Sequence, residues 1–114
     1  MNMKDLLKVA NENNFAIPAF NISDYSMFIG VMDTCEKTNS PVIIEIHPLE
    51  LDFTGTDLVE AIIKRAYKSS VPICLHLDHC GDYGKIIYAI QAGFTSVMFD
   101  GSSLPFEENI AGVR

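Results

Sequence analysis

Short apolar runs alternate with amphipathic segments along this chain. Most of the runs are rich in β-branched residues, which predicts strands over residues 16–20, 42–46, 71–77 and 95–99. Apolar residues recur at helical spacing elsewhere, which predicts helices over residues 3–14, 24–38, 58–68, 83–92 and from 105 onward. The chain is therefore expected to hold a leading helix and four strand–helix units.

Capping and chain-breaking residues mark the ends of several predicted elements. Ser23 is placed to cap the second helix, with Asp24 in the first turn. Pro48 is expected to end the second strand. Pro105 suits the first position of the last helix, where its missing N–H costs nothing.

The alternation of strands and helices favours a parallel sheet, because near-continuous apolar strands are typical of sheets covered on both faces. No linker or low-complexity tract divides residues 1–114, so a single α/β domain is expected. Two architectures fit this order. One is a small doubly wound sheet, and the other is the N-terminal half of a (β/α)8 TIM barrel, which needs about 250 residues when complete.

Polar residues stand at or just past the carboxyl end of every predicted strand. They are Asn21, His47, Asp78 with His79, and Asp100. Ligands bind at this edge in both architectures, but four consecutive strand ends converge on one site in a barrel. This favours an incomplete barrel domain with unpaired strand edges, which invite association into an oligomer.

Asp78 and His79 place a proton carrier beside a metal ligand at the mouth of a buried strand. In one interpretation, His79 binds a catalytic metal and Asp78 moves a proton to or from a substrate hydroxyl. In the other, Asp78 caps the following turn and His79 is a hydrogen-bonded loop residue. The position at a strand's carboxyl end adds weight to the catalytic interpretation, and both stay open.

The remaining polar residues also have two interpretations each. Asp100 either orients a cation or its ligands, or bonds the amides of its own turn. Asn21 either contacts substrate or belongs to a turn. His47 follows Glu45 by two residues, so on a strand both would share a face and could pair, bind a cation or touch substrate. His76 lies inside an apolar run and is interpreted as a hydrogen-bonded core histidine.

Charge and cysteine content exclude several classes of function. The net charge of −7, with scattered basic residues, argues against a nucleic-acid or anionic-membrane partner. Cys35, Cys74 and Cys80 are odd in number and form no C-x-x-C pair, so reduced thiols in the cytoplasm are expected. The first residues carry charge early and read as neither a signal peptide nor a membrane anchor.

Missing motifs narrow the chemistry further. No glycine-rich dinucleotide or P-loop motif follows a strand, which disfavours dinucleotide and ATP binding. No lysine stands at a strand end to form a Schiff base, and the cysteines have no triad arrangement. Metal-assisted acid–base chemistry is the class that remains.

Several segments together resemble the class II, zinc-dependent ketose-bisphosphate aldolases, which act on fructose or tagatose bisphosphate. The segments are 75–79 (LHLDH), 92–102 (AGFTSVMFDGS), 105–109 (PFEEN), 18–21 (PAFN) and 40–44 (SPVII). The resemblance runs from about residue 3 to the end of the chain. It implies a TIM barrel that cleaves a ketose 1,6-bisphosphate into dihydroxyacetone phosphate and glyceraldehyde 3-phosphate.

The resemblance also implies roles for individual residues. Asp78 matches the catalytic acid/base, and His79 matches one of three histidines on the catalytic Zn²⁺. Asp100 matches a carboxylate that contributes to a second divalent-cation position. His47 stands where the family commonly has a substrate-contacting serine, and Asn21 is the other expected substrate contact. A zinc ion stabilises enediolate charge as a Lewis acid, so no lysine is required.

The resemblance has departures, at His47 and at Ser103, where many fructose enzymes carry a further histidine. The other two zinc histidines, a catalytic glutamate and the phosphate loops are expected in a second half of the barrel. Unless His47, His76 or a carboxylate substitutes as a ligand, the isolated chain is therefore expected to bind zinc poorly. It is also expected to be inactive. The alternatives are a flavodoxin-like binding or signalling module and a non-catalytic partner of a full-length homologue.

Overall fold

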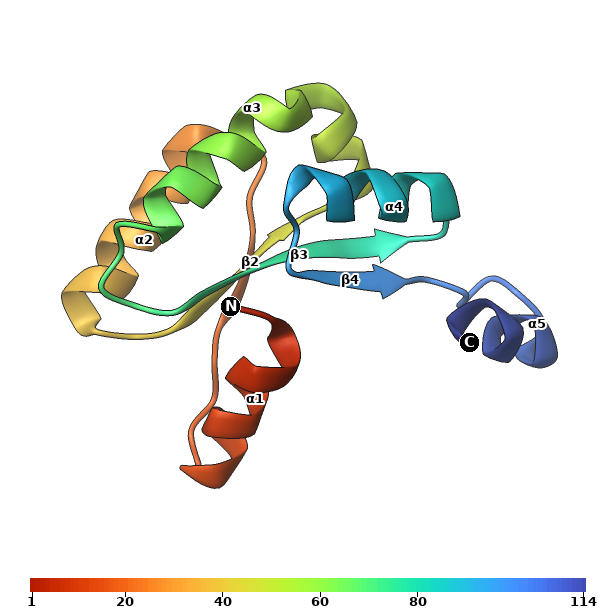
Figure 1. Ribbon diagram of the computed structural model, residues 1–114, viewed down its shortest axis with the longest axis horizontal. Helices are drawn as coiled ribbons and strands as arrows, with labels where there is room; N and C mark the ends of the chain where they lie inside the picture. Colours follow the sequence, from red (N-terminus) through yellow and green to blue (C-terminus); the bar gives the residue numbers. More distant parts are fainter.

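A computed structural model describes residues 1–114, and its helices and strands follow the predicted order (Figure 1). They are α1 (Met3–Glu12), β1 (Ala19–Asn21), α2 (Tyr25–Thr38), β2 (Val42–Ile46), α3 (Pro48–Ala66), β3 (Ile73–Cys80), α4 (Tyr83–Ala92), β4 (Ser96–Phe99) and α5 (Phe106–Val113). None of the helices has the length and apolar character needed to cross a membrane.

The four strands form one parallel sheet in the order β1-β2-β3-β4, so each strand pairs with the next one in the chain. The connecting helices α2, α3 and α4 lie on one side of the sheet, and α1 lies on the other (Figure 1). A doubly wound sheet reverses its strand order and carries connecting helices on both faces. The observed winding is that of half a TIM barrel, as predicted, and it contradicts the flavodoxin-like alternative.

Alternation along β2 and β3 separates two apolar clusters. Ile44, Ile46 and Leu77 face the connecting helices and belong to the main core, which also contains buried side chains of α2, α3 and α4. Ile43 and Cys74 face the other way and pack against Leu6 of α1 in a small second cluster. The sheet therefore has an outer, helix-covered face and an inner face that α1 covers only near the strand starts.

The inner face carries a row of polar residues above that second cluster. Asn21 is paired in register with Glu45, Glu45 with His76, and His76 with Ser96. Residues paired in register point to the same face of a sheet. The row thus crosses all four strands, and Asp78 lies one step further toward the carboxyl ends.

Helix α3 differs from its predicted range. Pro48 ends β2 as expected, but it also begins α3, which starts ten residues before the predicted position 58. Gly55, with φ 62° and ψ −158°, interrupts the helix, so α3 consists of two helical segments joined at a kink. Because glycine adopts positive φ without a steric penalty, the break costs little there.

Smaller differences concern three element ends. Asp24, not Ser23, caps α2, because its side chain accepts a hydrogen bond from the Met27 N–H at 2.8 Å. Pro105 is the N-cap of α5, so the helix begins at Phe106, one residue after the predicted start. Strand β3 continues through residue 80, past its predicted end at 77.

Two glycines provide a matched test of the fold. Gly93 ends α4 with φ 110°, and a Cβ there would lie 2.5 Å from the Ile63 Cδ1. Gly30 lies inside α2, and a Cβ there would meet nothing within 4 Å. We expect Gly93→Ala to lower the free energy of unfolding by about 1–2 kcal/mol. Gly30→Ala should raise it by about 0.5–1 kcal/mol, because alanine is the better helix former.

Urea denaturation followed by circular dichroism measures both changes. Equal effects of the two substitutions, in sign and size, would contradict the left-handed turn at Gly93.

Candidate active site at the carboxyl ends of the strands

The carboxyl end of β3 is irregular, and the irregularity brings two functional side chains together. The pairing of β3 with β4 shifts register between Leu77 and Cys80, and His79 has a φ of 46°. In a regular strand, consecutive residues point to opposite faces. The left-handed residue within the bulge breaks that alternation, so the His79 Nε2 lies 3.7 Å from the Asp78 Oδ1.

The Asp78 carboxylate is held by a second strand. The Asn21 Nδ2 donates a hydrogen bond to the Asp78 Oδ2 at 3.1 Å, and this contact joins β1 to β3 across β2. The Asp78 side chain is only 15% exposed. Asp78 is thus a nearly buried carboxylate with one oxygen fixed and the other facing His79.

The His79 imidazole is oriented by Asp100, which follows β4. The His79 Nδ1 lies 2.9 Å from the Asp100 Oδ2, and the Asp100 Oδ1 accepts a hydrogen bond from the Ser102 N–H at 3.0 Å. Hydrogen bonds from Ser102 and from His79 lower the pKa of Asp100 to about 2. Asp100 first, and Asp78 second, raise the pKa of His79 above its ordinary value.

Asp100 bonds an amide of its own turn, which is one of the two roles considered from the sequence, and it also contacts the His79 ring. When the Nδ1 of His79 donates to Asp100, the Nε2 of the neutral ring keeps its lone pair. A carboxylate behind an imidazole in this way is the usual support of a metal-binding histidine. The ring is half exposed on the side away from the sheet core.

His47 lies apart from this group. It caps α3, where its Nδ1 accepts a hydrogen bond from the Leu49 N–H at 3.2 Å and lies 3.5 Å from the Glu50 Oε2. The pairing with Glu45 considered from the sequence does not form, because β2 ends at Ile46 and the chain turns into the helix. No hydrogen bond or ion pair connects His47 with Asn21, Asp78, His79 or Asp100.

The sequence analysis did not predict a second cluster, which also includes Asp78. Glu45, His76 and Asp78 each offer a ligand atom, and these atoms lie within 4.8 Å of one another. His76 is a buried, hydrogen-bonded histidine as predicted, with its Nδ1 2.7 Å from the Ser96 Oγ. The signal was present in the sequence, since His76 and Asp78 are two residues apart on one strand and must share a face.

Burial shifts the pKa values of two residues in this cluster, Glu45 and His76. Burial, and then the charge of Asp78, raise the pKa of Glu45. Burial lowers the pKa of His76, which favours its neutral form. A carboxylate next to a second carboxylate in a partly desolvated position is costly unless a proton or a cation is shared between them.

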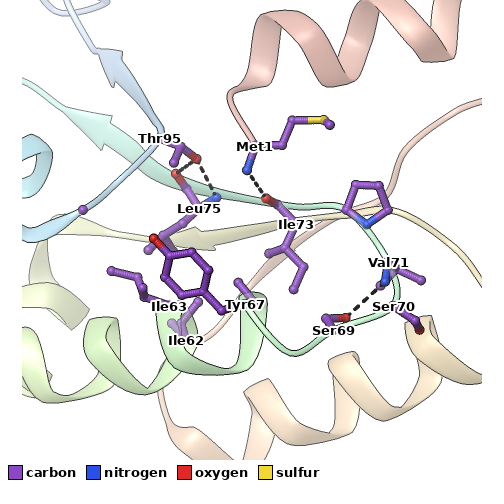
Figure 2. Close-up of a pocket in the computed structure, with 13 residues that line it drawn as sticks. Met1, Ile62, Ile63, Tyr67, Ser69, Ser70, Val71, Ile73, Leu75 and Thr95 are labelled. Carbon is purple, nitrogen blue, oxygen red and sulfur yellow. Dashed lines mark hydrogen bonds between the residues drawn. The ribbon is translucent and has the colours of Figure 1, made fainter.

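An apolar cavity lies at the other end of β3 and does not belong to this site (Figure 2). Its volume is about 510 Å³, and mainly apolar side chains line it, among them Ile62 and Ile63 of α3 and Ile73 of β3. The Met1 amino group donates a hydrogen bond to the Ile73 carbonyl at 2.9 Å beside it. No carboxylate, imidazole or lysine lines the cavity, so it lacks the groups for acid–base or metal chemistry.

Comparison with known proteins shows to which family the chain belongs. The family model described as class II fructose-bisphosphate aldolase matches residues 1–114. The fructose-bisphosphate aldolase of Mycoplasma genitalium is 42% identical over 113 residues, which cover 96% of this chain and 39% of the relative. The D-tagatose-1,6-bisphosphate aldolase subunit GatY of Klebsiella oxytoca is 39% identical over 112 residues, covering 97% of this chain and 39% of the relative.

The fold agrees as well. The crystal structure of the YdjI aldolase from Escherichia coli K12 superimposes with a TM-score of 0.91 at 32% identity, covering 97% of this chain and 44% of that one. Aldolases are thus the class of protein to which the fold and the comparisons point. The chain belongs to the class II fructose-bisphosphate aldolase family, and it spans about two fifths of the length of the curated relatives it matches.

The His79–Asp100 pair generates a prediction for the metal-free chain. We expect Asp100→Asn to lower the pKa of His79 toward its ordinary value near 6.5, because the main contact that stabilises the imidazolium is removed. An NMR titration of the ring protons measures the change. His47 serves as an internal control, since it makes no contact with Asp100, and Asp33→Asn on α2 is the matched variant. An unchanged His79 titration would show that the pair does not form in solution.

Proposed function

We propose that this protein takes part in the metal-dependent aldol cleavage and condensation of a ketose 1,6-bisphosphate. The products of cleavage are dihydroxyacetone phosphate and glyceraldehyde 3-phosphate. The observation that carries the proposal is the position of Asp78, a nearly buried carboxylate held by Asn21 beside an imidazole at the barrel mouth. Family membership supports the same reaction class.

Asp78 is proposed as the acid/base that exchanges a proton with the substrate hydroxyl on the aldehyde half. A group in this role needs a fixed position and a free oxygen within reach of the reacting atom. The Asn21 amide fixes one oxygen of Asp78, and the second oxygen lies 3.7 Å from the His79 Nε2. Asn21 and His47 are proposed substrate contacts, His47 from the helix cap next to the strand ends.

The donor set fits one part of a metal centre. His79 is proposed as a ligand of Zn²⁺ through its Nε2, with Asp100 as the orienting carboxylate or as a ligand of a second divalent cation. A bound zinc supplies Lewis-acid stabilisation of charge on the ketone oxygen. Catalytic zinc takes three protein ligands, and His79 is the one imidazole at this rim, so further ligands must come from elsewhere.

The chain spans only about two fifths of the length of its relatives, and this fact leads to a second part of the proposal. We infer that residues 1–114 form the first part of a barrel domain that acts in the cytoplasm. β1 and β4 are the edges of the sheet, and each presents one unpaired side to a further strand. The isolated chain is proposed to be inactive and to associate through these edges, with itself or with a homologous barrel.

A chimeric protein tests the role of Asp78. The chain is joined to the part of the Mycoplasma genitalium relative that it does not cover, and cleavage of fructose and tagatose bisphosphate is followed by a coupled assay. We expect Asp78→Asn to lower kcat by about 10²- to 10⁴-fold, as is typical for a lost general acid/base. The KM should change much less, because the amide keeps the size and the hydrogen bond to Asn21.

Asp57→Asn, on the exposed side of α3, is the matched control and should leave kcat unchanged. The 114-residue chain assayed alone should show no cleavage above background. Cleavage by the Asp78→Asn chimera at the unsubstituted rate would reject the acid/base assignment, and Asp78-dependent cleavage by the chain alone would reject the need for the rest of the barrel.

A further inference from the structure

The inner face of the sheet holds a group of potential ligands that the proposed aldolase site does not use as a set. Glu45 of β2 and His76 of β3 are paired in register, and Asp78 follows His76 by two residues on the same face. One ligand atom of each lies within 4.8 Å of the other two. The three potential metal ligands therefore lie on two adjacent strands whose relative position is fixed by backbone hydrogen bonds.

The existing hydrogen bonds leave ligand atoms of His76 and Glu45 without a partner. The only side-chain hydrogen bond of His76 uses its Nδ1, which lies 2.7 Å from the Ser96 Oγ. When that nitrogen donates to the hydroxyl, the Nε2 carries the free lone pair. His76 is 8% exposed, so its ring is held firmly by its surroundings. Glu45 makes no side-chain hydrogen bond or ion pair at all.

The negative charges of this group favour the binding of a cation. Two carboxylates, Glu45 and Asp78, approach each other on a partly desolvated face, and no lysine or arginine contacts either. Two basic side chains of the outer helices are engaged elsewhere, Lys85 with Asp52 and Arg65 with Asp33 and Glu36. His79 is the one basic side chain in contact with Asp78, and its closer partner is Asp100.

We propose that Glu45, His76 and Asp78 form a binding site for a divalent first-row transition metal, separate from the His79–Asp100 position. One imidazole and two carboxylates suit Zn²⁺, Mn²⁺ or Fe²⁺ better than Mg²⁺ or Ca²⁺, which prefer oxygen alone. Ser96 is the supporting residue that orients the imidazole. Because Asp78 belongs to both sites, a metal here holds the carboxylate as a ligand and withdraws it from proton transfer.

Calorimetric titration of the metal-free 114-residue chain with Zn²⁺ tests the site without any measurement of activity. We expect Glu45→Gln to weaken one binding event by at least about tenfold, and Ser96→Ala to weaken it by about 10- to 100-fold, as a lost supporting hydrogen bond does. Glu60→Gln on the exposed surface of α3 removes the same charge and should change nothing. Circular dichroism of each variant checks that the fold is retained.

His79→Ala separates this inference from the proposed function. It should abolish binding at the rim and leave the event that depends on Glu45 unchanged. Nitrogen NMR of the histidine rings gives a second readout, in which Zn²⁺ should shift the Nε2 of His76 in the His79→Ala chain. Unchanged affinity in both Glu45→Gln and Ser96→Ala would overturn the site. Loss of all binding in His79→Ala would also overturn it, since a single site at the rim would then explain the data.

Discussion

The strict alternation of side chains along β2 and β3, locked in register by the parallel ladder, is the constraint on which the rest of this structure depends. Ile44 and Leu75 point toward the helices, so Glu45 and His76 must point away from them. A slip of one residue would place carboxylates under the helices, where an unpaired charge is very costly. Because the apolar residues of β2 and β3 must face the helices, the polar residues between them must meet on the inner face.

The bulge at the end of β3 is the one place where this alternation is broken, and the break has a chemical consequence. In a regular strand, His79 would point toward the helices when Asp78 points inward. With φ at 46°, its ring reaches both Asp78 and Asp100 instead. A left-handed histidine is uncommon and costs free energy, which the two carboxylate contacts and the ladder on either side offset.

Sequence periodicity was sufficient for the order of elements, the parallel sheet and the meeting of Asn21, Asp78, His79 and Asp100. Periodicity was insufficient where the local path of the chain decides the role of a residue. Ser23 and Asp24 are both good caps, and only the angle at which the chain enters α2 decides between them. His47 was assigned by strand alternation, but a proline directly after it turns the chain into a helix.

Glu45 and His76 were missed for another reason. Their proximity depends on the stagger between two strands that are separated in the sequence by the whole of α3, and no local pattern encodes that stagger. The register becomes predictable only after the packing of α3 on both strands is known. The same holds for the bulge at the end of β3, because the register shift depends on how β3 pairs with β4.

The distribution of positive charge bears on which part of the proposed reaction these residues could serve. Phosphate groups are bound by arginine, lysine or helix N-termini with free N–H groups. Arg65 lies on the outer helices and is bonded to Glu36, and Lys85 is bonded to Asp52. The rim itself carries the carboxylates Asp78 and Asp100, which repel a phosphate dianion. The ketose bisphosphate proposed as substrate would therefore be anchored by groups outside these residues. Its reacting carbons would then lie near the carboxylate of Asp78 and the imidazole of His79.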